Sequence, residues 1–572
     1  MGELGRGSFS LPGFYERRIR RILPAFWLVL AASGLAGLFC VLPEDLRLLA
    51  KSTAAAALFG SNLLFARLAA DYFNADNLTL QPLLHTWSLA VEAQFYLLFP
   101  LVLMPLRGRR HATAGVLAAL AAASFAFGAW GAVHRPVSAF YLLPGRAWEL
   151  LLGGLLACAG PLRLRGWMAD LAVAAGLAGI AAAALLYDAA TPFPGPPALL
   201  PCLGAALVIG GGAGGGRAAA LLGARGPAWL GRISYSLYLW HWPVIVLARY
   251  GRGPDLPLAT RLALLAGTVA LAALTYRFVE RPFIARRALP RRRALLGAAL
   301  AATLAGLALA EGLDLTGRGL LPLTRLPPAV ATLAAGAFDR LEGECPVPTG
   351  DAALPYPCRF GAPGVTPSVA LWGNSYARMW VPALAQDAEA HATAGLALIV
   401  SKCPPLLGLD EPSLPACAPF NRDAAAFLAA DPAIHSVVLG ADWFLYDREL
   451  HRLDATLDAL GAAGKRVFVL LAPPQADYPV PRSLAMAALR REPPPPPPDA
   501  ARAREAQGVS RALIFAAAAR HGATVIDPAS RLCDGATCPV ERDGHALFYD
   551  AGHITVFAAR AIHGLFDPVV AR

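Results

Sequence analysis

Two short segments far apart in the chain combine residue types that could carry out nucleophilic catalysis. Ser375 stands in a tight turn after an apolar, strand-like run, and the segment Asp550-Ala551-Gly552-His553 lies near the carboxyl terminus. A serine hydroxyl is a weak nucleophile until an imidazole accepts its proton, and that imidazole needs a carboxylate to fix its tautomer. Ser375, His553 and Asp550 are therefore the expected nucleophile, base and orienting acid. Helix caps also favour serine, so the spacing alone leaves a structural role open.

A second set of polar residues lies within the apolar first half of the chain. Between Pro82 and Pro100, one face of a predicted helix carries His85, Ser88, Glu92 and Tyr96. An ionisable group inside a bilayer-length apolar segment is costly and normally faces a protein interior or a wet cavity. The sequence therefore predicts a polar site in a helical bundle, with an interhelical hydrogen-bond seam as the alternative. The candidates for this site are His85, Glu92, Arg146, Glu149 and His241, of which Arg146 and Glu149 are spaced to pair across one helical turn.

The composition is typical of a membrane protein. Of the 572 residues, 56% are hydrophobic and 16% are charged, and the mean hydropathy is +0.49. The hydrophobicity is uneven, because apolar segments of bilayer length recur only up to about residue 310. We therefore expect a multi-pass transmembrane domain at 1–310, a linker rich in Pro, Gly and Leu at 311–367, and a soluble domain at 368–572.

The arginines indicate how the chain crosses the membrane. Four of them between residues 17 and 21 precede the first apolar run, and the later basic loops all fall on the same side. This pattern predicts a cytoplasmic amino terminus and a soluble domain outside the cytoplasm. The net charge of +11 is then a topology signal, so we expect membrane lipid and no nucleic acid as a partner. The nine expected crossings are Ile22–Leu42, His85–Leu106, Ala112–Val133, Ala139–Cys158, Met168–Tyr187, Ala198–Ala213, Ile233–Tyr250, Thr260–Glu280 and Arg293–Ala310, with Leu46–Phe65 interfacial or re-entrant.

In the soluble domain, short strand-like runs alternate with helical stretches. This alternation predicts an α/β fold with a doubly wound, mostly parallel sheet. Ligands of such sheets gather at the carboxyl ends of the strands, and Ser375 directly follows the first of them. The expected strands are Val369–Trp372, Leu396–Val400, Ser436–Gly440, Arg466–Pro473 and Ala523–Asp527.

Six of the nine cysteines form three locally spaced couples in the soluble part. An even set within one domain suggests disulfides and an oxidising compartment. A zinc site is the alternative, but the spacings are not CxxC-like and no histidine accompanies the couples. The expected pairs are Cys345 with Cys358, Cys403 with Cys417, and Cys533 with Cys538.

The two candidate catalytic segments resemble a known hydrolase family. GNSYA (Gly373–Ala377) and DAGHIT (Asp550–Thr555) are similar to the first and last blocks of the SGNH, or GDSL-like, hydrolases and esterases. The resemblance implies that Ser375 is the nucleophile and that its backbone N–H helps to form an oxyanion hole. It also implies that His553 is the base and Asp550 the acid that orients it, in agreement with the residue types.

Two positions depart from the pattern of that family. Asn374 stands where the first block usually has an aspartate. Gly440-Ala441-Asp442-Trp443 lies where a GxND block is usual, but it lacks the asparagine. The resemblance therefore assigns the triad and leaves the remaining oxyanion donors open.

Four segments of the apolar half resemble the acyltransferase 3 family of membrane O-acyltransferases. They are FYERRIRRILPA (Phe14–Ala25), LLHTWSLAVEAQFYLLFP (Leu83–Pro100), LGRISYSLYLWHWP (Leu230–Pro243) and YRFVERPF (Tyr276–Phe283), in the order of the family. Their fusion to an SGNH-like domain resembles bacterial enzymes that O-acetylate surface polysaccharides, lipopolysaccharide or peptidoglycan. The resemblance implies an inner-membrane enzyme with a periplasmic carboxy-terminal domain. It would transfer an acyl group, expected to be acetyl, from cytoplasmic acyl-CoA to a hydroxyl of a cell-envelope glycan.

Three arginines near the amino terminus fit such a donor. Arg17, Arg18 and Arg21 lie on the side where the phosphates of CoA would arrive, and a guanidinium group suits phosphate. A role in topology alone is the alternative, and the two roles are compatible. Acyl-CoA is here a substrate, and no permanently bound cofactor or metal is expected.

One departure concerns the start of the chain. Members of the acyltransferase 3 family usually begin with two further transmembrane helices, the first carrying an arginine and a histidine that the family needs for acyl transfer. The sequence starts after both, so we expect the native reading frame to begin upstream of Met1. Two other functions stay open: an outward-facing esterase anchored by the bundle, and a non-enzymatic transport or assembly protein of the envelope.

Overall fold

The computed structural model describes residues 9–70, 78–106, 109–160, 164–188, 191–252, 256–321, 326–339, 358–410, 414 and 416–571. They belong to two compact units. The first, Met1–Ala248 with Pro257–Arg325, is helical; the second, Arg249–Leu256 with Leu326–Arg572, contains the β-sheet. The two units are defined by the contacts between their residues. The domain boundaries expected after residues 310 and 367 stay predictions.

Seven helices among the described residues are long and apolar enough to cross a membrane. Two of the nine expected crossings are helices that do not meet this description. Helix α11 (Leu199–Gly212) has only 14 residues, about 21 Å at 1.5 Å per residue, which is short for a bilayer core. Helix α13 (Arg225–Arg249) is long enough but carries arginine, serine and histidine among its apolar residues. The seven are Leu11–Cys40 (α2), Thr86–Leu106 (α6 and η2), Arg110–His134 (α7), Pro136–Ala159 (α8 and α9), Trp167–Leu186 (α10), Leu258–Ile284 (α14, η4 and α15) and Arg292–Gly317 (α16).

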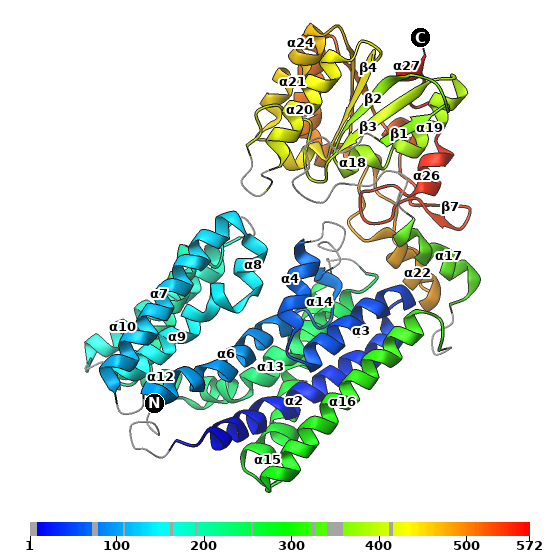
Figure 1. Ribbon diagram of the computed structural model, residues 1–572. Coiled ribbons are helices and arrows are strands. Elements are labelled where there is room, and N and C mark those ends of the chain that lie inside the picture. The colour runs from blue at the N-terminus through cyan, green and yellow to red at the C-terminus, as the bar shows by residue number, and fades with distance from the viewer. Residues whose placement is uncertain are drawn as a thin grey trace. The chain divides into compact units, whose positions relative to one another are not determined.

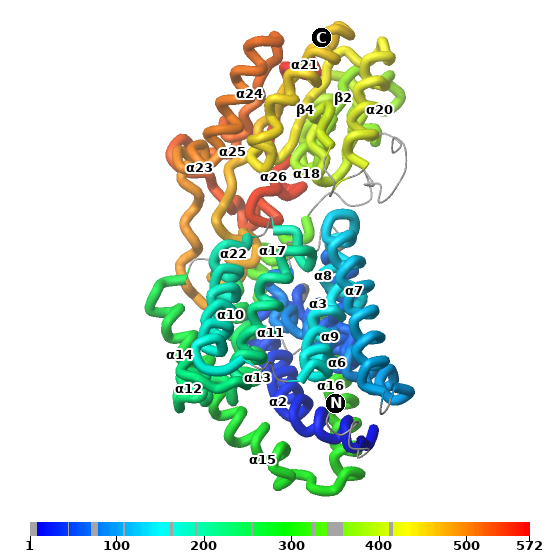
Figure 2. Tube along the Cα trace, turned by 90° about the vertical axis from the view of Figure 1, so that its left-hand side faces the viewer, coloured from blue at the N-terminus to red at the C-terminus, as the bar shows by residue number. Residues whose placement is uncertain are grey.

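Small residues allow helices of this unit to pack closely. Helices α10 and α11 lie side by side (Figure 2), and a Cβ atom at Gly176 would overlap the carbonyl oxygen of Gly204. Such close contact between backbones is characteristic of helix pairs in membranes. The segment expected to be interfacial or re-entrant is divided by a turn into α3 (Pro43–Ala57) and α4 (Ser61–Ala70), and α3 packs along α16 (Figure 1).

The second unit contains a six-stranded sheet with the order β1-β3-β2-β4-β5-β6. All neighbours are parallel except β1 and β3, which are antiparallel, so the mostly parallel, doubly wound sheet is confirmed. Strand β1 lies in the stretch expected to be a linker. The strands are β1 (Cys358–Gly361), β2 (Pro367–Gly373), β3 (Ala394–Ile399), β4 (Ser436–Gly440), β5 (Arg466–Leu470) and β6 (Thr524–Ile526).

Alternating side chains of the strands build a core on each face of the sheet. Val369 and Leu371 of β2 belong to one cluster, and Ala370 and Trp372 to the other. Helices α20, α21 and α24 cover the second face, and α19 and α27 lie on the first (Figure 1). The helices of this unit are α17 (Pro328–Ala335), α18 (Ser375–Arg378), α19 (Val381–Ala390), α20 (Cys417–Ala430), α21 (Leu453–Ala462), α22 (Val480–Arg490), α23 (Ala500–Ala506), α24 (Gly508–His521), α25 (Ala529–Leu532), α26 (Val556–Ala561) and α27 (Asp567–Val570).

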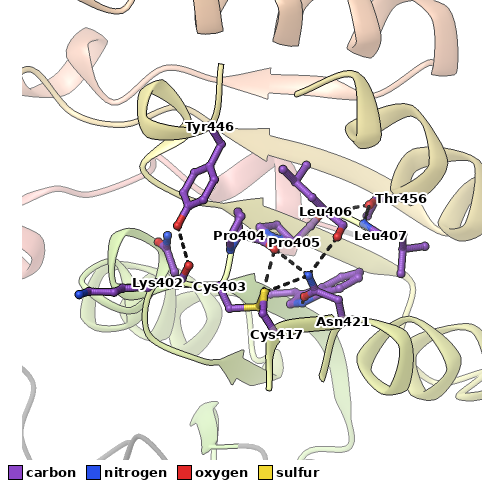
Figure 3. The surroundings of a disulfide bond; sticks show 12 residues. Lys402, Cys403, Pro404, Pro405, Leu406, Leu407, Cys417, Asn421, Tyr446 and Thr456 are labelled. Atoms are coloured by element: carbon purple, nitrogen blue, oxygen red, sulfur yellow. Dashed lines mark hydrogen bonds between the residues drawn. A yellow bond between two sulfur atoms is a disulfide. The ribbon is translucent and has the colours of Figure 1, made fainter. Parts of the chain in front are cut away.

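Two of the three expected disulfides are confirmed, Cys403–Cys417 and Cys533–Cys538. Cys345 of the third expected pair with Cys358 lies outside the described residues. The first disulfide ties the loop after β3 to α20 (Figure 3). Nearby, the Asn421 side chain donates hydrogen bonds to the carbonyl oxygens of Pro404 and Leu406, at 2.8 and 3.1 Å. This loop is therefore fixed at the edge of the sheet where the parallel strands end.

Candidate active site

Ser375 is placed by the turn between β2 and α18. A Cβ atom at Gly373 would overlap the carbonyl oxygen of Gly440 on the neighbouring strand, so only glycine allows this approach of β2 to β4. The Asn374 side chain then caps α18, because its Oδ1 accepts a hydrogen bond from the Tyr376 N–H at 3.0 Å. The turn thus holds Ser375 at the carboxyl end of a central strand.

His553 and Asp550 complete a hydrogen-bonded triad with Ser375. Ser375 Oγ lies 2.9 Å from His553 Nε2, and His553 Nδ1 lies 2.7 Å from Asp550 Oδ2. The second carboxylate oxygen of Asp550 accepts the backbone N–H groups of Gly552 and His553, at 2.8 and 2.7 Å. These contacts fix the carboxylate, and the carboxylate fixes the ring. The three residues have the geometry of a serine nucleophile with its base and orienting acid.

The electrostatics of the triad keep its carboxylate charged. Burial raises the pKa of Asp550, but the His553 ring and the backbone N–H groups of His553 and Gly552 lower it by more, so the net shift is downward. A charged Asp550 is what stabilises the imidazolium formed when His553 accepts a proton.

Two tyrosine rings enclose the imidazole. The ring centroids of Tyr376 and Tyr549 lie 4.2 and 5.1 Å from that of His553, and the Tyr549 ring is nearly parallel to it. Gln475 donates a hydrogen bond to the Tyr376 hydroxyl at 2.8 Å, which holds one of the two rings. Neither tyrosine was predicted as a site residue, although each directly adjoins a residue of the triad in the sequence.

Asn374 and Asp442 also form a pair beside the triad. The Asn374 amide donates a hydrogen bond to the Asp442 carboxylate, which is buried. Burial raises the pKa of Asp442, and the hydrogen bond from Asn374 opposes the rise. In the family pattern, the first block has an aspartate at the position of Asn374 and the GxND block has an asparagine at the position of Asp442. The two residue types have therefore exchanged positions in this chain, and a hydrogen bond joins their side chains.

In the helical unit, the structure brings His85 and His241 together. Their ring centroids lie 5.7 Å apart, and Tyr238 of α13 lies 5.4 Å from His85. The Tyr238 hydroxyl donates a hydrogen bond to the carbonyl oxygen of His85 at 2.7 Å and lies 2.5 Å from Ser88 Oγ. The part of the predicted polar stripe that contains His85 and Ser88 therefore faces α13.

The part of the stripe that contains Glu92 and Tyr96 contacts the amino-terminal helix. The Tyr96 hydroxyl donates to the Glu92 carboxylate at 2.5 Å, and the Arg18 guanidinium lies 3.9 Å from the centre of the Tyr96 ring. Arg17 and Arg21 lie on exposed positions of the same helix. Of the three arginines proposed for the donor, Arg18 thus adjoins the stripe directly.

Arg146 and Glu149 form a separate cluster. Arg146 Nη2 lies 3.3 Å from Glu149 Oε2, and the Arg146 guanidinium lies 4.9 to 5.5 Å from the ring centres of Phe193, Phe140 and Trp87. Trp87 follows His85 by two residues, about 200° around the helix, so the two clusters lie on different faces of α6. The single polar interior expected from the sequence is divided in two.

A further ionic network near the amino terminus was missed. The buried Glu16 carboxylate lies 3.1 Å from Arg20 Nε and 3.0 Å from Arg292 Nε. The spacing of Glu16 and Arg20, four residues apart on one helix, could have indicated the first pair. Arg20 also donates hydrogen bonds to the carbonyl oxygens of Ala288 and Pro290, at 3.3 and 3.0 Å, so it holds α2 to the segment before α16.

Comparison with known proteins connects both units to acyl transfer. Residues 344–568 match the family described as "SGNH domain (fused to AT3 domains)", and residues 2–277 match the family described as "Acyltransferase domain". The chain is 33% identical over 268 residues to the "Putative membrane-bound transacylase BcsY" of Komagataeibacter xylinus, covering 47% of this chain and 68% of that protein. It is 28% identical over 291 residues to the "O-acetyltransferase OatA" of Staphylococcus aureus, a match that spans 48% of each chain.

A solved structure is also similar to part of the chain. It is the periplasmic domain of the Salmonella ser. Paratyphi A lipopolysaccharide acetyltransferase, which matches 35% of this chain and 82% of that domain, with 14% identity and a TM-score of 0.29. The TM-score is too low for this similarity to carry weight.

Proposed function

The chain belongs to the acyltransferase 3 family and carries the SGNH domain that occurs fused to it, and from this premise we propose that it acylates a cell-envelope glycan. The enzyme is a membrane acyltransferase. The proposed donor is cytoplasmic acyl-CoA, the proposed group is acetyl, and the proposed acceptor is a hydroxyl of lipopolysaccharide, exopolysaccharide or peptidoglycan. The printed names of OatA and BcsY, an O-acetyltransferase and a transacylase, support this choice.

The observation that carries the proposal is the complete hydrogen-bonded triad. Ser375 Oγ attacks the acyl carbonyl, and its proton passes to His553 Nε2, 2.9 Å away. The leaving group takes that proton as the bond to the acyl carbon breaks. The acceptor hydroxyl then attacks the acyl-serine, its proton passes to His553, and Ser375 leaves with this proton. Asp550 stays charged and orients the ring throughout.

The helical unit would deliver the acyl group to this site. We propose the bacterial inner membrane as its location, with the α/β unit on the periplasmic side. The two disulfides support an oxidising compartment for that unit. Arg17, Arg18 and Arg21 would attract the phosphates of CoA on the cytoplasmic side. His85, His241 and Glu92 would line the route of the acyl group, and Arg146 and Glu149 would form a second polar site on another face of α6.

Substitution of Ser375 by Ala tests the proposal. The O-acetyl content of envelope glycans would be measured in cells that produce the full-length protein, its Ser375→Ala variant, or Ser530→Ala as a control at an exposed serine. We expect Ser375→Ala to lower glycan acetylation by ~10³-fold or to background, as for other triad nucleophiles, and Ser530→Ala to have no effect. Unchanged acetylation in Ser375→Ala would refute the proposal. Acetyl release from acetylated glycan without transfer would instead indicate an esterase.

A further inference from the structure

A cavity of about 590 Å³ opens in the α/β unit, close to the residues that surround the triad. Two of its lining residues, Gln475 and Phe444, also contact Tyr376: Gln475 through the hydrogen bond to its hydroxyl, and Phe444 edge to face with ring centroids 6.1 Å apart. Tyr376 itself packs on the ring of His553. Two side chains in succession, one of these lining residues and then Tyr376, therefore connect the cavity to the catalytic base.

One wall of the cavity is a run of consecutive prolines. Pro495, Pro496, Pro497 and Pro498 line it. Tyr478 donates a hydrogen bond to the carbonyl oxygen of Pro496 at 2.8 Å, and the Cys538 N–H donates to that of Pro498 at 2.9 Å. Consecutive prolines have fixed φ angles and no N–H donors, so this wall is stiff and presents only ring faces and carbonyl acceptors. The cavity is thus formed before a ligand arrives.

The remaining lining combines aromatic, acidic, basic and amide side chains. Tyr478 and Phe444 supply aromatic faces, Asp477 a carboxylate and Arg502 a guanidinium. Gln507 is held by a hydrogen bond from its amide to the carbonyl oxygen of Pro473, at 2.9 Å. This set offers both donors and acceptors at the sides of a partly apolar space.

We propose that the cavity binds the acceptor glycan, through a sugar residue adjoining the one that is acylated. A sugar presents many hydroxyls, each able to donate to a carboxylate and accept from a guanidinium, and a C–H face that packs on aromatic and proline rings. An acyl chain would need an apolar lining without Asp477 and Arg502. The volume falls within the ~300–1,000 Å³ that is usual for small-molecule sites. The assignment rests on the proposed function and adds where the acceptor is held.

The double variant Asp477→Ala/Arg502→Ala tests this assignment in the full-length protein. Its matched control is Arg504→Ala/Glu505→Ala, which changes an exposed base and acid on the same helix as Arg502, outside the cavity. Two quantities would be measured: glycan O-acetyl content in cells, and hydrolysis of 4-nitrophenyl acetate by the purified protein. We expect the cavity variant to lose ~10-fold or more of glycan acetylation, because hydrogen bonds to charged groups contribute more to binding than those between neutral groups. Hydrolysis of the small ester should stay within about twofold.

The outcomes separate this inference from the proposed function. If Ser375→Ala leaves glycan acetylation unchanged, the proposed function fails whatever the cavity variant does. If Ser375→Ala abolishes acetylation while the cavity variant behaves like its control, the glycan site is refuted and the proposed function stands. A parallel loss of small-ester hydrolysis in the cavity variant would also refute the assignment, because the substitutions would then act on the triad. Tyr478→Phe, which frees the wall at Pro496, should reduce glycan acetylation with the same selectivity.

Discussion

The polar sites of the two units differ in how completely their side chains are paired. In the α/β unit, Ser375, His553 and Asp550 are joined by hydrogen bonds of 2.7 to 2.9 Å. In the described part of the helical unit, both ring nitrogens of His85, and one polar atom each of Arg146 and Glu149, are buried without a hydrogen-bond partner. A buried polar atom left unpaired costs about 1–3 kcal/mol, so native proteins seldom keep one without a purpose. The triad is thus held by hydrogen bonds within the α/β unit, whereas the helical site leaves several of its polar atoms without such contacts.

The cause of the difference lies in how each fold positions side chains. The triad stands on loops at the ends of parallel strands, where Gly373, Asn374 and Gly552 fix the backbone within a few residues of the reacting groups. In the helical unit each polar group is placed by the rotation of a whole helix. Pairing there depends on neighbouring helices, as Tyr238 of α13 shows by bonding the backbone of His85. Substitutions in one unit can therefore test the triad separately from the proposed passage of the acyl group through the helical unit.

The largest effect is expected from matched histidine substitutions. His553→Ala should reduce hydrolysis of 4-nitrophenyl acetate by the purified full-length protein ~10³-fold or more, because no base remains at Ser375. His85→Ala should leave this hydrolysis within about twofold, because the histidine belongs to the other site. The same variant should reduce transfer from acetyl-CoA to glycan ~10²-fold, the usual size of an acid–base contribution.

Exposed histidines provide the controls for this pair. His451→Ala in the α/β unit and His134→Ala at the end of α7 should change neither reaction. Equal loss of ester hydrolysis in His85→Ala and His553→Ala would show that the two sites do not act separately. Full hydrolysis in His553→Ala would remove the triad interpretation.

A smaller effect is expected from Gly552→Ala, which adds one methyl group beside the triad. The new Cβ would overlap the Tyr376 hydroxyl and lie 3.0 Å from Gln475 Nε2. Crowding of this kind costs about 1–3 kcal/mol, and displacement of Tyr376 and His553 should lower ester hydrolysis ~10-fold. Thermal unfolding and ester kinetics of the purified protein would measure the two changes.

Gly461→Ala in α21 is the matched control for this substitution. The structure has nothing within 4 Å of a Cβ at that position, so the variant should gain about 0.5–1 kcal/mol and keep full activity. If Gly552→Ala behaved in the same way, the packing of the Asp550–His553 turn against Tyr376 would have no part in positioning the base.

The sequence predicted those parts of the fold whose signal is local. Each of the five expected strands overlaps an observed one, because short β-branched runs between helices are read directly from the chain. Strand β1 was missed, since its four residues, Cys358–Gly361, have no alternation of their own and are held by antiparallel pairing with β3. The nine crossings exceeded the seven suitable helices because residues 198–213 and 233–250 are apolar in part but short or polar as helices.

In the candidate site, too, the sequence predicted only the residues that stand in local motifs. Ser375, Asp550 and His553 stand in local motifs, and the structure brings them within hydrogen-bond distance. Their supports do not stand in motifs, because Gln475 and Asp442 reach partners 99 and 68 residues away. Likewise, periodicity placed His85 and Glu92 on one face, but only the packing of helices reveals that Arg146 faces elsewhere.

The smallest effect is expected at Asp442, the buried acid beside the triad. Burial raises its pKa above the ordinary 3.8 despite the hydrogen bond from Asn374, so the folded state binds a proton more tightly than the unfolded state. As the pH rises from that ordinary value through the raised one, the native protein should lose stability relative to Asp442→Asn, which cannot ionise and can still accept the Asn374 hydrogen bond. Thermal unfolding at about pH 4 and about pH 7 would show the variant gaining on the native protein at the higher pH. Asp410→Asn, at an exposed position, should show no such trend. A difference independent of pH would mean that Asp442 ionises as readily as a solvated acid. The contacts of its carboxylate would then fully offset the effect of burial on its pKa.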